Sequence, residues 1–257
     1  MRADVFLYEN GYCDSRTKAA SACKEGRLYV NGNRITKSSF DIKESDTVEL
    51  KEGGLKYVGR GGLKMEGAIN AFSLDVSGKV CVDIGASTGG FTDCLLQNGA
   101  IKVYAVDCGS GQLHPSLVKD ARVVNIENFN ARELSEEKLG RKCDIAVMDV
   151  SFISQTLLHS AVKKVLKDEG MFITLIKPQF EVGRGAIGKG GLVKDKKARI
   201  NACRAVIASA SACGLVLKGL TVSPISGGDG NTEYLALFSL SDGGVGIDAE
   251  KILKSIN

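Results

Sequence analysis

The sequence predicts a doubly wound α/β domain with a mainly parallel sheet, preceded by a small α+β domain. Three observations support this fold class. From about residue 63 onwards, apolar segments of strand length alternate with helix-like segments, as in parallel sheets covered by helices on both faces. Before that point, two short helix patterns precede a hairpin signal at Asn31-Gly32. A chain of 257 residues is also long enough for one large and one small core.

The first fifty residues predict two helices and a hairpin. We expect one helix over 2–10 that ends at Gly11, and a second that Ser15 caps and Gly26 ends. A strand over 27–30 then turns through Asn31-Gly32, the dipeptide best suited to a type I′ hairpin. Residues 51–62 contain five glycines and predict an interdomain linker. The domains are therefore expected at 1–50 and 63–257.

In the larger domain, strands and helices take turns. Strands are expected at 79–84, 102–107, 122–125, 143–149, 170–177, 215–222 and 232–240. Helices are expected at 89–98, 131–138, 153–166 and 195–213. The last two strands follow each other directly, so we expect a hairpin-like pair to close the sheet.

Composition excludes several classes of protein. No apolar run approaches the roughly 18 residues that cross a bilayer, and the N-terminus lacks the apolar region of a signal peptide, so a cytoplasmic protein is expected. The eight cysteines form no CxxC pair. We interpret them as reduced core residues rather than disulfides or zinc ligands, and expect no metal.

Charge is uneven along the chain. Residues 1–64 carry 12 Lys/Arg against 9 Asp/Glu, which is +3 of the formal +4. Arg16 and Lys18 lie in the first turn of the second predicted helix, where the helix dipole disfavours cations. Phosphate oxygens would favour them, because cations and free backbone N–H groups together form an anion site. Solvated surface charges explain the same pattern equally well.

A resemblance carried by the N-terminal motifs favours phosphate binding over solvated surface charges. They are Arg2-x-Asp4, Ser15-Arg16-x-x-Ala19, Gly26-Arg27-Leu-x-Val30-Asn31-Gly32 and Lys37. Together they resemble the small RNA-binding module of ribosomal proteins, pseudouridine synthases and some rRNA methyltransferases. The resemblance implies that basic residues of the helices and hairpin contact structured RNA. The candidate contacts are Arg2, Arg16, Lys18, Arg27 and Arg34.

A glycine-rich turn follows the first strand of the larger domain, in Val80-Cys-Val-Asp83-Ile-Gly85-Ala-Ser-Thr-Gly89-Gly90-Phe91. Such a turn directs backbone N–H groups into the crevice where doubly wound sheets bind ligands. The next strand ends in Asp107, which is placed to accept hydrogen bonds from ribose hydroxyls. The sequence therefore predicts a nucleoside-containing cofactor at this edge.

The spacing of this turn distinguishes two cofactors. It is Gly-x-x-x-Gly-Gly rather than the Gly-x-Gly-x-x-Gly of NAD enzymes, and Asp83 would face a pyrophosphate. A cationic sulfonium without phosphates suits an acidic turn better, so we predict S-adenosylmethionine. The candidate cofactor residues are Asp83, Gly85, Ala86, Ser87, Thr88, Gly89, Gly90, Phe91, Asp107 and Asp149.

A second glycine-rich stretch, Gly183 to Lys189, has P-loop spacing. Gly190 stands where a Ser or Thr would hold magnesium, and no helix follows at once, so we reject a P-loop. We interpret 182–193 as a mobile flap whose Arg184 and Lys189 are available to RNA phosphates. A plain surface loop explains the stretch equally well.

Four ionisable residues lie where the predicted topology gathers side chains. Lys64 opens the helix after the linker, Asp149 and Lys177 end strands, and Glu233 begins the last strand. Each alone fits a solvated charge or a structural ion pair better. Together, in order and context, they resemble the Lys-Asp-Lys-Glu tetrad of FtsJ-like RNA ribose 2′-O-methyltransferases.

Longer strings resemble the TlyA family, which joins this RNA-binding module to this methyltransferase domain. They are Arg60-Gly-Gly-Leu-Lys64, Asp107-Cys-Gly-Ser-Gly-Gln-Leu-His114, Asp149-Val-Ser-Phe-Ile153, Lys177-Pro-Gln-Phe-Glu181 and Gly230-Asn-Thr-Glu233-Tyr. The resemblance implies a Rossmann-like methyltransferase sheet and methylation of a cytidine ribose 2′-hydroxyl in rRNA. It implies a catalytic role for the tetrad and adds Arg60 to the RNA contacts.

The resemblance also leaves alternatives. Lys177 either accepts the hydroxyl proton or stays charged and stabilises the oxyanion, because Lys64 and the two carboxylates of the tetrad act on it in opposite directions. Gly59 stands where the family often has Ser, which indicates a looser interdomain hinge. The short segment before the RNA-binding module favours the large ribosomal subunit alone as substrate. The oligomeric state stays open.

Three other functions compete with this one. A ribosome-assembly factor with an inactive methyltransferase fold is opposed by the complete tetrad and the intact cofactor turn. A membrane-active haemolysin, suggested only by the historical name of the family, needs a membrane segment that the sequence does not show. A base methyltransferase would carry an Asn-Pro-Pro-Tyr type of loop, which is absent.

Overall fold

The computed structural model describes residues 1–51, 56–240 and 247–255. It divides into two compact units, Met1–Arg60 and Gly61–Asn257. Of the predicted linker, residues 52–55 lie outside the described residues, whereas Gly61 and Gly62 already belong to the first helix of the larger unit. That helix therefore begins before the expected boundary at residue 63.

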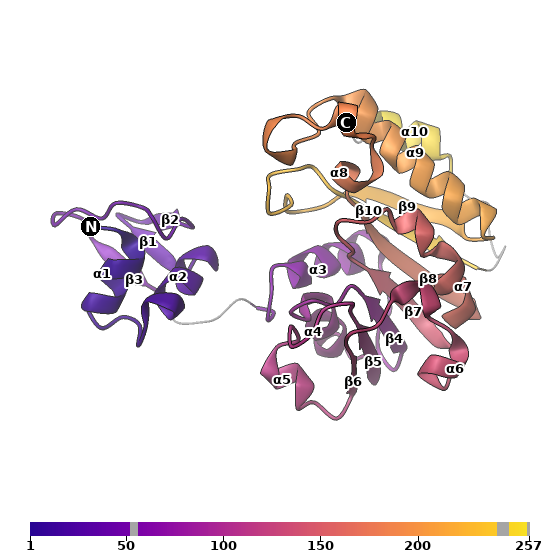
Figure 1. Cartoon of the computed structure of the whole chain (residues 1–257), viewed down its shortest axis with the longest axis horizontal. Helices are drawn as coiled ribbons and strands as arrows, with labels where there is room; N and C mark the ends of the chain where they lie inside the picture. Colours follow the sequence, from indigo (N-terminus) through magenta and orange to yellow (C-terminus); the bar gives the residue numbers. More distant parts are fainter. Residues whose placement is uncertain (52–55, 241–246, 256–257) are drawn as a thin grey trace. The chain divides into compact units, whose positions relative to one another are not determined.

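The small unit packs two helices, α1 (Ala3–Glu9) and α2 (Arg16–Lys24), against a short antiparallel sheet. Its strands are β1 (Leu28–Val30), β2 (Asn33–Ile35) and β3 (Val48–Leu50), in the order β2-β1-β3 (Figure 1). The core consists of small and aliphatic side chains, among them Ala3, Leu7, Ala19, Leu28 and Ile42.

Two local predictions for this unit are confirmed. The Ser15 hydroxyl accepts a hydrogen bond from Lys18 N–H (3.2 Å) and so caps α2. Asn31 and Gly32 have φ values of 51° and 76°, the two positive values that a type I′ turn requires. The third strand, β3, was not predicted. It is only three residues long and lies in a stretch rich in charged and polar residues.

The larger unit is built on a sheet in the order β6-β5-β4-β7-β8-β10-β9. Its strands are β4 (Val80–Ile84), β5 (Lys102–Val106), β6 (Val123–Ile126), β7 (Cys143–Met148), β8 (Leu166–Ile176), β9 (Val216–Val222) and β10 (Tyr234–Ser239). Strands β4 to β8 pair in parallel, whereas β10 is antiparallel to both β8 and β9. The doubly wound sheet and its closing antiparallel pair are confirmed.

Helices cover both faces of this sheet (Figure 1). The α-helices are α3 (Gly61–Phe72), α4 (Gly90–Gln97), α5 (Pro115–Val118), α6 (Glu136–Leu139), α7 (His159–Val165), α8 (Pro178–Glu181), α9 (Lys196–Ala212) and α10 (Ala249–Ser255). Helices α3 and α4 lie on one face, and α7, α9 and α10 on the other. Among the described helices, none is long and apolar enough to cross a membrane.

Two predicted helices are interrupted, and capping side chains explain why. The expected helix over 131–138 is a 3₁₀ turn, Ala131–Glu133, followed by α6, because Ser135 accepts from Lys138 N–H and starts a new helix. The expected helix over 153–166 begins only at His159, because Ser154 caps a separate 3₁₀ turn, Gln155–Leu157.

The cysteine prediction needs one correction. All eight cysteines are free thiols, and Cys81 and Cys143 are buried in β4 and β7 as expected. Cys108, however, is exposed, because it follows Asp107 in the loop after β5 and does not lie inside the strand.

Candidate active site

The parallel strands bring their carboxyl ends to one edge of the sheet, where the predicted tetrad collects. Asp149 follows β7 and Lys177 follows β8. Because β10 runs antiparallel and pairs Tyr234 with Ile176, Glu233 lies at the same edge as Lys177. Lys64 reaches this edge from the first turn of α3. The four residues arise from four elements that meet only in the folded chain.

The tetrad forms two ion pairs. Lys177 Nζ lies 2.6 Å from Asp149 Oδ1 and donates a hydrogen bond to Ser151 Oγ (2.7 Å). Lys64 Nζ donates to Glu233 Oε2 at 2.6 Å, and the Glu233 side chain is only 2% exposed. The first pair lines a cavity, whereas the second is buried and links α3 to the start of β10. The structure thus gives the two pairs different surroundings.

The cofactor turn is anchored by Asp83. This carboxyl group is fully buried, and its Oδ2 accepts hydrogen bonds from Thr92 N–H (3.0 Å) and Thr92 Oγ1 (2.7 Å) at the start of α4. Its Oδ1 has no hydrogen-bond partner among the described residues. Burial raises the pKa of Asp83 to about 7, against which the bonds from Thr92 act. Asp83 is among the residues that line a cavity at this edge.

Gly85 explains why this turn needs glycine. Its φ is +82°, and a Cβ atom here would lie 2.9 Å from the carbonyl oxygen of Asp149. The strands β4 and β7 can therefore approach closely at this edge, with Asp149 N–H donating to the Ile84 carbonyl at 3.0 Å. Any larger residue would force the cofactor turn away from the tetrad.

Asp107 has a structural role that the sequence did not predict. Its carboxylate accepts hydrogen bonds from Ser87 N–H and Gly109 N–H, both at 2.8 Å, and so ties the cofactor turn to the loop after β5. Gln112 Nε2 lies at 3.5 Å from the same carboxylate. The role of Asp107 in ribose binding stays a prediction, whereas its role in joining two loops is visible.

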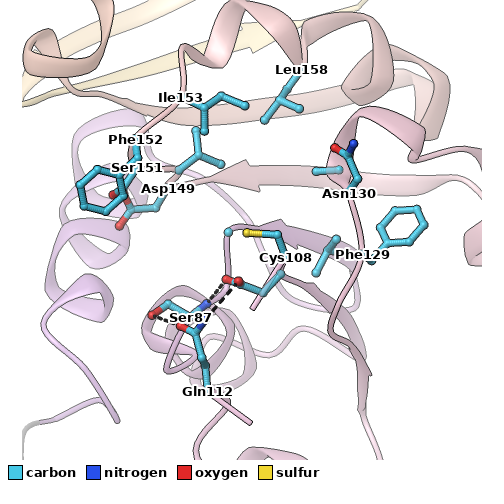
Figure 2. Close-up of a pocket in the computed structure, with 15 residues that line it drawn as sticks. Ser87, Cys108, Gln112, Phe129, Asn130, Asp149, Ser151, Phe152, Ile153 and Leu158 are labelled. Atoms are coloured by element: carbon cyan, nitrogen blue, oxygen red, sulfur yellow. Dashed lines mark hydrogen bonds between the residues drawn. The ribbon is translucent and has the colours of Figure 1, made fainter. Parts of the chain in front are cut away.

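Two adjoining cavities occupy this edge. The larger, of about 350 Å³, is mainly apolar, and Figure 2 shows Phe129 and Asn130 on one side of it and Asp149, Ser151 and Phe152 on the other. The smaller, of about 200 Å³, holds Asp83 and Lys177. The residues that line both are Gly85, Ser87, Asp149 and Ser151. An elongated ligand with an apolar nucleoside end and a charged end fits this pair of cavities.

Of the predicted cofactor residues, all but one line a cavity. The exception is Gly89, which faces Leu113 and Leu117 instead. Its φ of +92° turns the chain into α4. The sequence missed the lining residues Cys108, Phe129, Asn130, Ser151 and Phe152. Each follows a strand end, so the rule that located the tetrad could have located them too.

Phe152 stands out in its exposure. Its side chain is 91% exposed, and it adopts a φ of 66°, which is unusual for a bulky residue. Its ring lies 5.2 Å from that of Phe180, centroid to centroid. An aromatic face is thus presented to solvent beside Ser151 and the Lys177–Asp149 pair.

Three of the predicted RNA contacts in the small unit form ion pairs with aspartates. Asp4 pairs with Arg2 (2.9 Å) and Arg16 (3.4 Å), and these guanidinium groups hold the pKa of Asp4 below its ordinary value. Lys18 pairs with Asp14 at 2.6 Å. The side chains of Arg2, Arg16 and Lys18 nevertheless remain more than half exposed, so RNA contact by them stays a prediction.

The other RNA candidates differ in their surroundings. Arg34 donates hydrogen bonds to the carbonyl groups of Gly26 (2.9 Å) and Glu25 (3.0 Å), and so stabilises the turn after α2. Arg27 donates to the Lys51 carbonyl (3.2 Å). Arg60 and Lys189 are exposed, and the side chain of Arg184 lies outside the described residues.

The predicted flap is partly structured. Residues 182–193 contain two 3₁₀ turns, Arg184–Ala186 and Lys189–Gly191. The Asn231 side chain accepts from Val193 N–H and donates to the Gly191 carbonyl, both at 2.9 Å. The end of the stretch is therefore fastened beside Glu233, two residues further along the chain.

Comparison with known proteins identifies the family. Residues 57–240 match the FtsJ-like methyltransferase family, and residues 1–48 match the S4 domain. The chain belongs to the FtsJ-like methyltransferase family. The matched FtsJ-like region contains the whole sheet and every residue of the tetrad.

Proteins that are similar to this chain over most of their length carry different names. Hemolysin A of Brachyspira hyodysenteriae is 44% identical over 93% of this chain and 99% of its own length. The 16S/23S rRNA (cytidine-2′-O)-methyltransferase TlyA of Mycobacterium tuberculosis is 40% identical over 91% of this chain and 87% of its own. A solved structure, a putative hemolysin from Streptococcus thermophilus, is 40% identical, covers 100% of this chain and 94% of its own, and has a TM-score of 0.78.

Proposed function

We propose that this FtsJ-like protein transfers a methyl group from S-adenosylmethionine to a cytidine ribose 2′-hydroxyl in rRNA. The observation that carries the proposal is the Lys177–Asp149 pair, which lies where the two cavities meet. The name of the M. tuberculosis relative, which is similar over most of both chains, supports the substrate. When bound, the cofactor would supply an electrophilic sulfonium methyl group.

The cavities fit this cofactor in size and chemistry. The apolar cavity beside Phe129 and Asn130 suits an adenosine, and the smaller cavity beside Asp83 suits a charged amino-acid end. The free Oδ1 of Asp83 would accept a hydrogen bond from an ammonium group, which needs an acceptor at this depth. A pyrophosphate would instead meet the Asp83 and Asp149 carboxyl groups, which disfavour it.

Lys177 has the position to orient the attacking hydroxyl. A ribose hydroxyl is a poor nucleophile at neutral pH, so the enzyme must align it and stabilise the negative charge that develops as its proton leaves. Lys177 Nζ now donates to Ser151 Oγ. A substrate hydroxyl that takes the place of Ser151 would be held by the same ammonium group. The Asp149 carboxylate, 2.6 Å from Lys177 Nζ, would hold this group in place while it orients the hydroxyl.

The RNA itself needs two kinds of contact. Exposed cations of the S4 unit, such as Arg16 and Lys18, would neutralise phosphates and position the RNA without reading its sequence. At the site, Phe152 offers an aromatic face on which an unstacked base can lie, a common mode of recognition of single RNA bases. We further propose the large ribosomal subunit as the preferred substrate, although the name of the M. tuberculosis relative includes both rRNAs.

The test is methyl transfer to separately purified ribosomal subunits that lack the modification. We expect label from S-adenosylmethionine to appear on large-subunit rRNA, and nuclease digestion with mass spectrometry to place it on the ribose of a cytidine. Label on a base would contradict ribose methylation. No transfer to either subunit, with the cofactor bound, would favour an assembly factor with an inactive methyltransferase fold.

A further inference from the structure

The segment that follows β7 is fastened at two points to the segment that follows β8. At its start, Asp149 and Ser151 both contact Lys177 Nζ, at 2.6 and 2.7 Å. At its end, the Glu181 carboxylate accepts hydrogen bonds from Ser154 Oγ (2.6 Å) and Gln155 N–H (2.9 Å). Between these two points the segment rises into solvent and presents Phe152.

The second fastening point is firmly held by the sheet. Gln155 is buried, its Nε2 donates to the Leu175 carbonyl (3.2 Å), and its Oε1 accepts from Thr174 Oγ1 (2.6 Å) in β8. Glu181 ends α8, so it sits on the element that directly follows Lys177. Burial raises the pKa of Glu181, which the bond from Ser154 opposes. Burying a carboxyl group is unfavourable unless it forms hydrogen bonds, and the bonds from Ser154 and Gln155 meet this need.

Phe152 needs this support. A phenylalanine with a φ of 66° is strained, and such residues persist only where the surroundings leave no alternative. The ring of Phe152 also contacts that of Phe180 in α8, at 5.2 Å between centroids, but it stays 91% exposed. Without Glu181, Ser154 Oγ and Gln155 N–H would lose this partner, and the end of the segment would be held only through the Gln155 side chain. Phe152 could then relax to a negative φ.

We propose that Glu181 is a positioning residue for the RNA substrate, which keeps Phe152 presented beside the tetrad by holding Ser154 and Gln155. Glu181 touches neither cofactor nor substrate and acts only through the segment that it holds. This inference rests on the proposed function, because it assigns Phe152 to the RNA side of the site. The cofactor side is held separately, by Lys177 at Asp149 and Ser151.

A matched control exists at another loop, one that contributes Gln112 to the lining of the larger cavity. Glu127 also holds a loop, since its carboxylate accepts hydrogen bonds from Gly111 N–H (2.7 Å) and Gln112 N–H (2.9 Å). These backbone bonds hold the pKa of Glu127 below its ordinary value. Gln112 lines the cavity that we assign to the cofactor. The Glu181→Gln and Glu127→Gln variants therefore make the same chemical change at two carboxyl groups that hold different loops.

The first measurement is steady-state methylation with the ribosomal subunit and the cofactor varied in turn. For Glu181→Gln we expect KM for the subunit to rise about tenfold, as for the removal of one charged hydrogen bond, with kcat and cofactor affinity changed less than about threefold. For Glu127→Gln we expect the affinity for the cofactor to fall and KM for the subunit to remain unchanged. An unchanged KM for the subunit in Glu181→Gln, or an equal loss of cofactor affinity, would overturn the proposal.

A second measurement does not depend on activity. The chain contains no tryptophan, so Phe152→Trp introduces a single reporter at the presented position. We expect its fluorescence anisotropy to fall when Glu181→Gln or Ser154→Ala is added. The two changes together should give no greater fall than Glu181→Gln alone, because the bond from Ser154 is one of the two that Glu181 accepts. Unchanged anisotropy would overturn the positioning role. If no variant, nor the wild type, transfers methyl groups while anisotropy falls as expected, the proposed function fails and the role of Glu181 in holding the segment stands.

Discussion

At the scale of single residues, Asp83 shows how the cofactor turn combines burial with charge. Two hydrogen bonds from Thr92 satisfy one carboxyl oxygen, and the other has no partner among the described residues. Burial therefore favours the protonated form and raises the pKa of Asp83 to about 7 from its ordinary value of 3.8. A hydrogen-bond donor that reached this oxygen would satisfy it.

This leads to a prediction about pH. In the unfolded chain Asp83 loses its proton above about pH 4, whereas in the folded chain it keeps it to about pH 7. Between these values the folded protein binds more protons, so its stability without cofactor falls as pH rises. We expect the stability of Asp83→Asn relative to wild type to increase from pH 4 to 7 and then level off. Urea denaturation at each pH measures it, and a pH-independent difference would contradict the assignment.

Gly85 gives a second prediction at this scale. Its positive φ and the approach of the Asp149 carbonyl leave no room for a side chain. We expect Gly85→Ala to weaken binding of S-adenosylmethionine by at least about tenfold, because the turn must shift away from the tetrad edge. Isothermal titration calorimetry measures this affinity. Gly78→Ala is the matched control, since Gly78 also has a positive φ but open space around its Cα, and equal losses in both would contradict the steric reason.

At the scale of elements, the Lys64–Glu233 pair joins α3 to β10. Both side chains are nearly inaccessible to water, and neither element precedes or follows the other directly in the chain. The pair therefore fixes the helix that begins the FtsJ-like region to the strand that completes it. A buried ion pair of this kind contributes little net stability, but it specifies how α3 and β10 are arranged.

The pair predicts a contrast between single and double variants. Lys64→Met leaves the Glu233 carboxylate buried without a partner, which costs about 3–5 kcal/mol of unfolding free energy. Replacing both residues, as Lys64→Met with Glu233→Leu, removes both charges, so most of this stability should be recovered. Activity should stay low in both proteins. Denaturant titration measures the contrast, and a double variant no more stable than Lys64→Met would contradict it.

The same scale shows what sequence patterns can and cannot predict. The tetrad was predictable because each member follows or precedes a strand or opens a helix at the same edge, and strand ends of a doubly wound sheet converge. The breaks before α6 and α7 were not, because Ser135 and Ser154 act as caps only in the folded context. The positive φ of Phe152 and the loop-joining role of Asp107 depend on neighbours distant in the sequence.

At the scale of the whole molecule, the two units divide the work. The unit Met1–Arg60, which contains the S4 domain, has 11 Lys/Arg against 9 Asp/Glu, or +2 of the formal +4. The FtsJ-like region carries the cavities and the tetrad. Phosphate contacts in the S4 unit, as proposed above, would raise the affinity for RNA without any change at the site of chemistry.

This division predicts a salt effect. Removing one cation that neutralises a phosphate should reduce the slope of log affinity against log salt concentration by roughly 1. We expect Arg16→Ala with Lys18→Ala to weaken subunit binding, to lower this slope by about 1 to 2, and to leave affinity for S-adenosylmethionine unchanged. Lys254→Ala, which removes an exposed cation of α10, is the control. An unchanged slope would exclude these side chains from phosphate binding.

The central claim, that Lys177 acts on the substrate hydroxyl, is tested most directly by single-turnover methylation with Lys177→Ala. Lys167→Ala is the matched control, because Lys167 also pairs with an aspartate, Asp144, at 2.6 Å, but at the opposite edge of the sheet. We expect Lys177→Ala to slow transfer by about 100-fold or more, with cofactor affinity within about threefold of wild type and Lys167→Ala unaffected. Transfer by Lys177→Ala at the rate of the Lys167→Ala control would contradict the account.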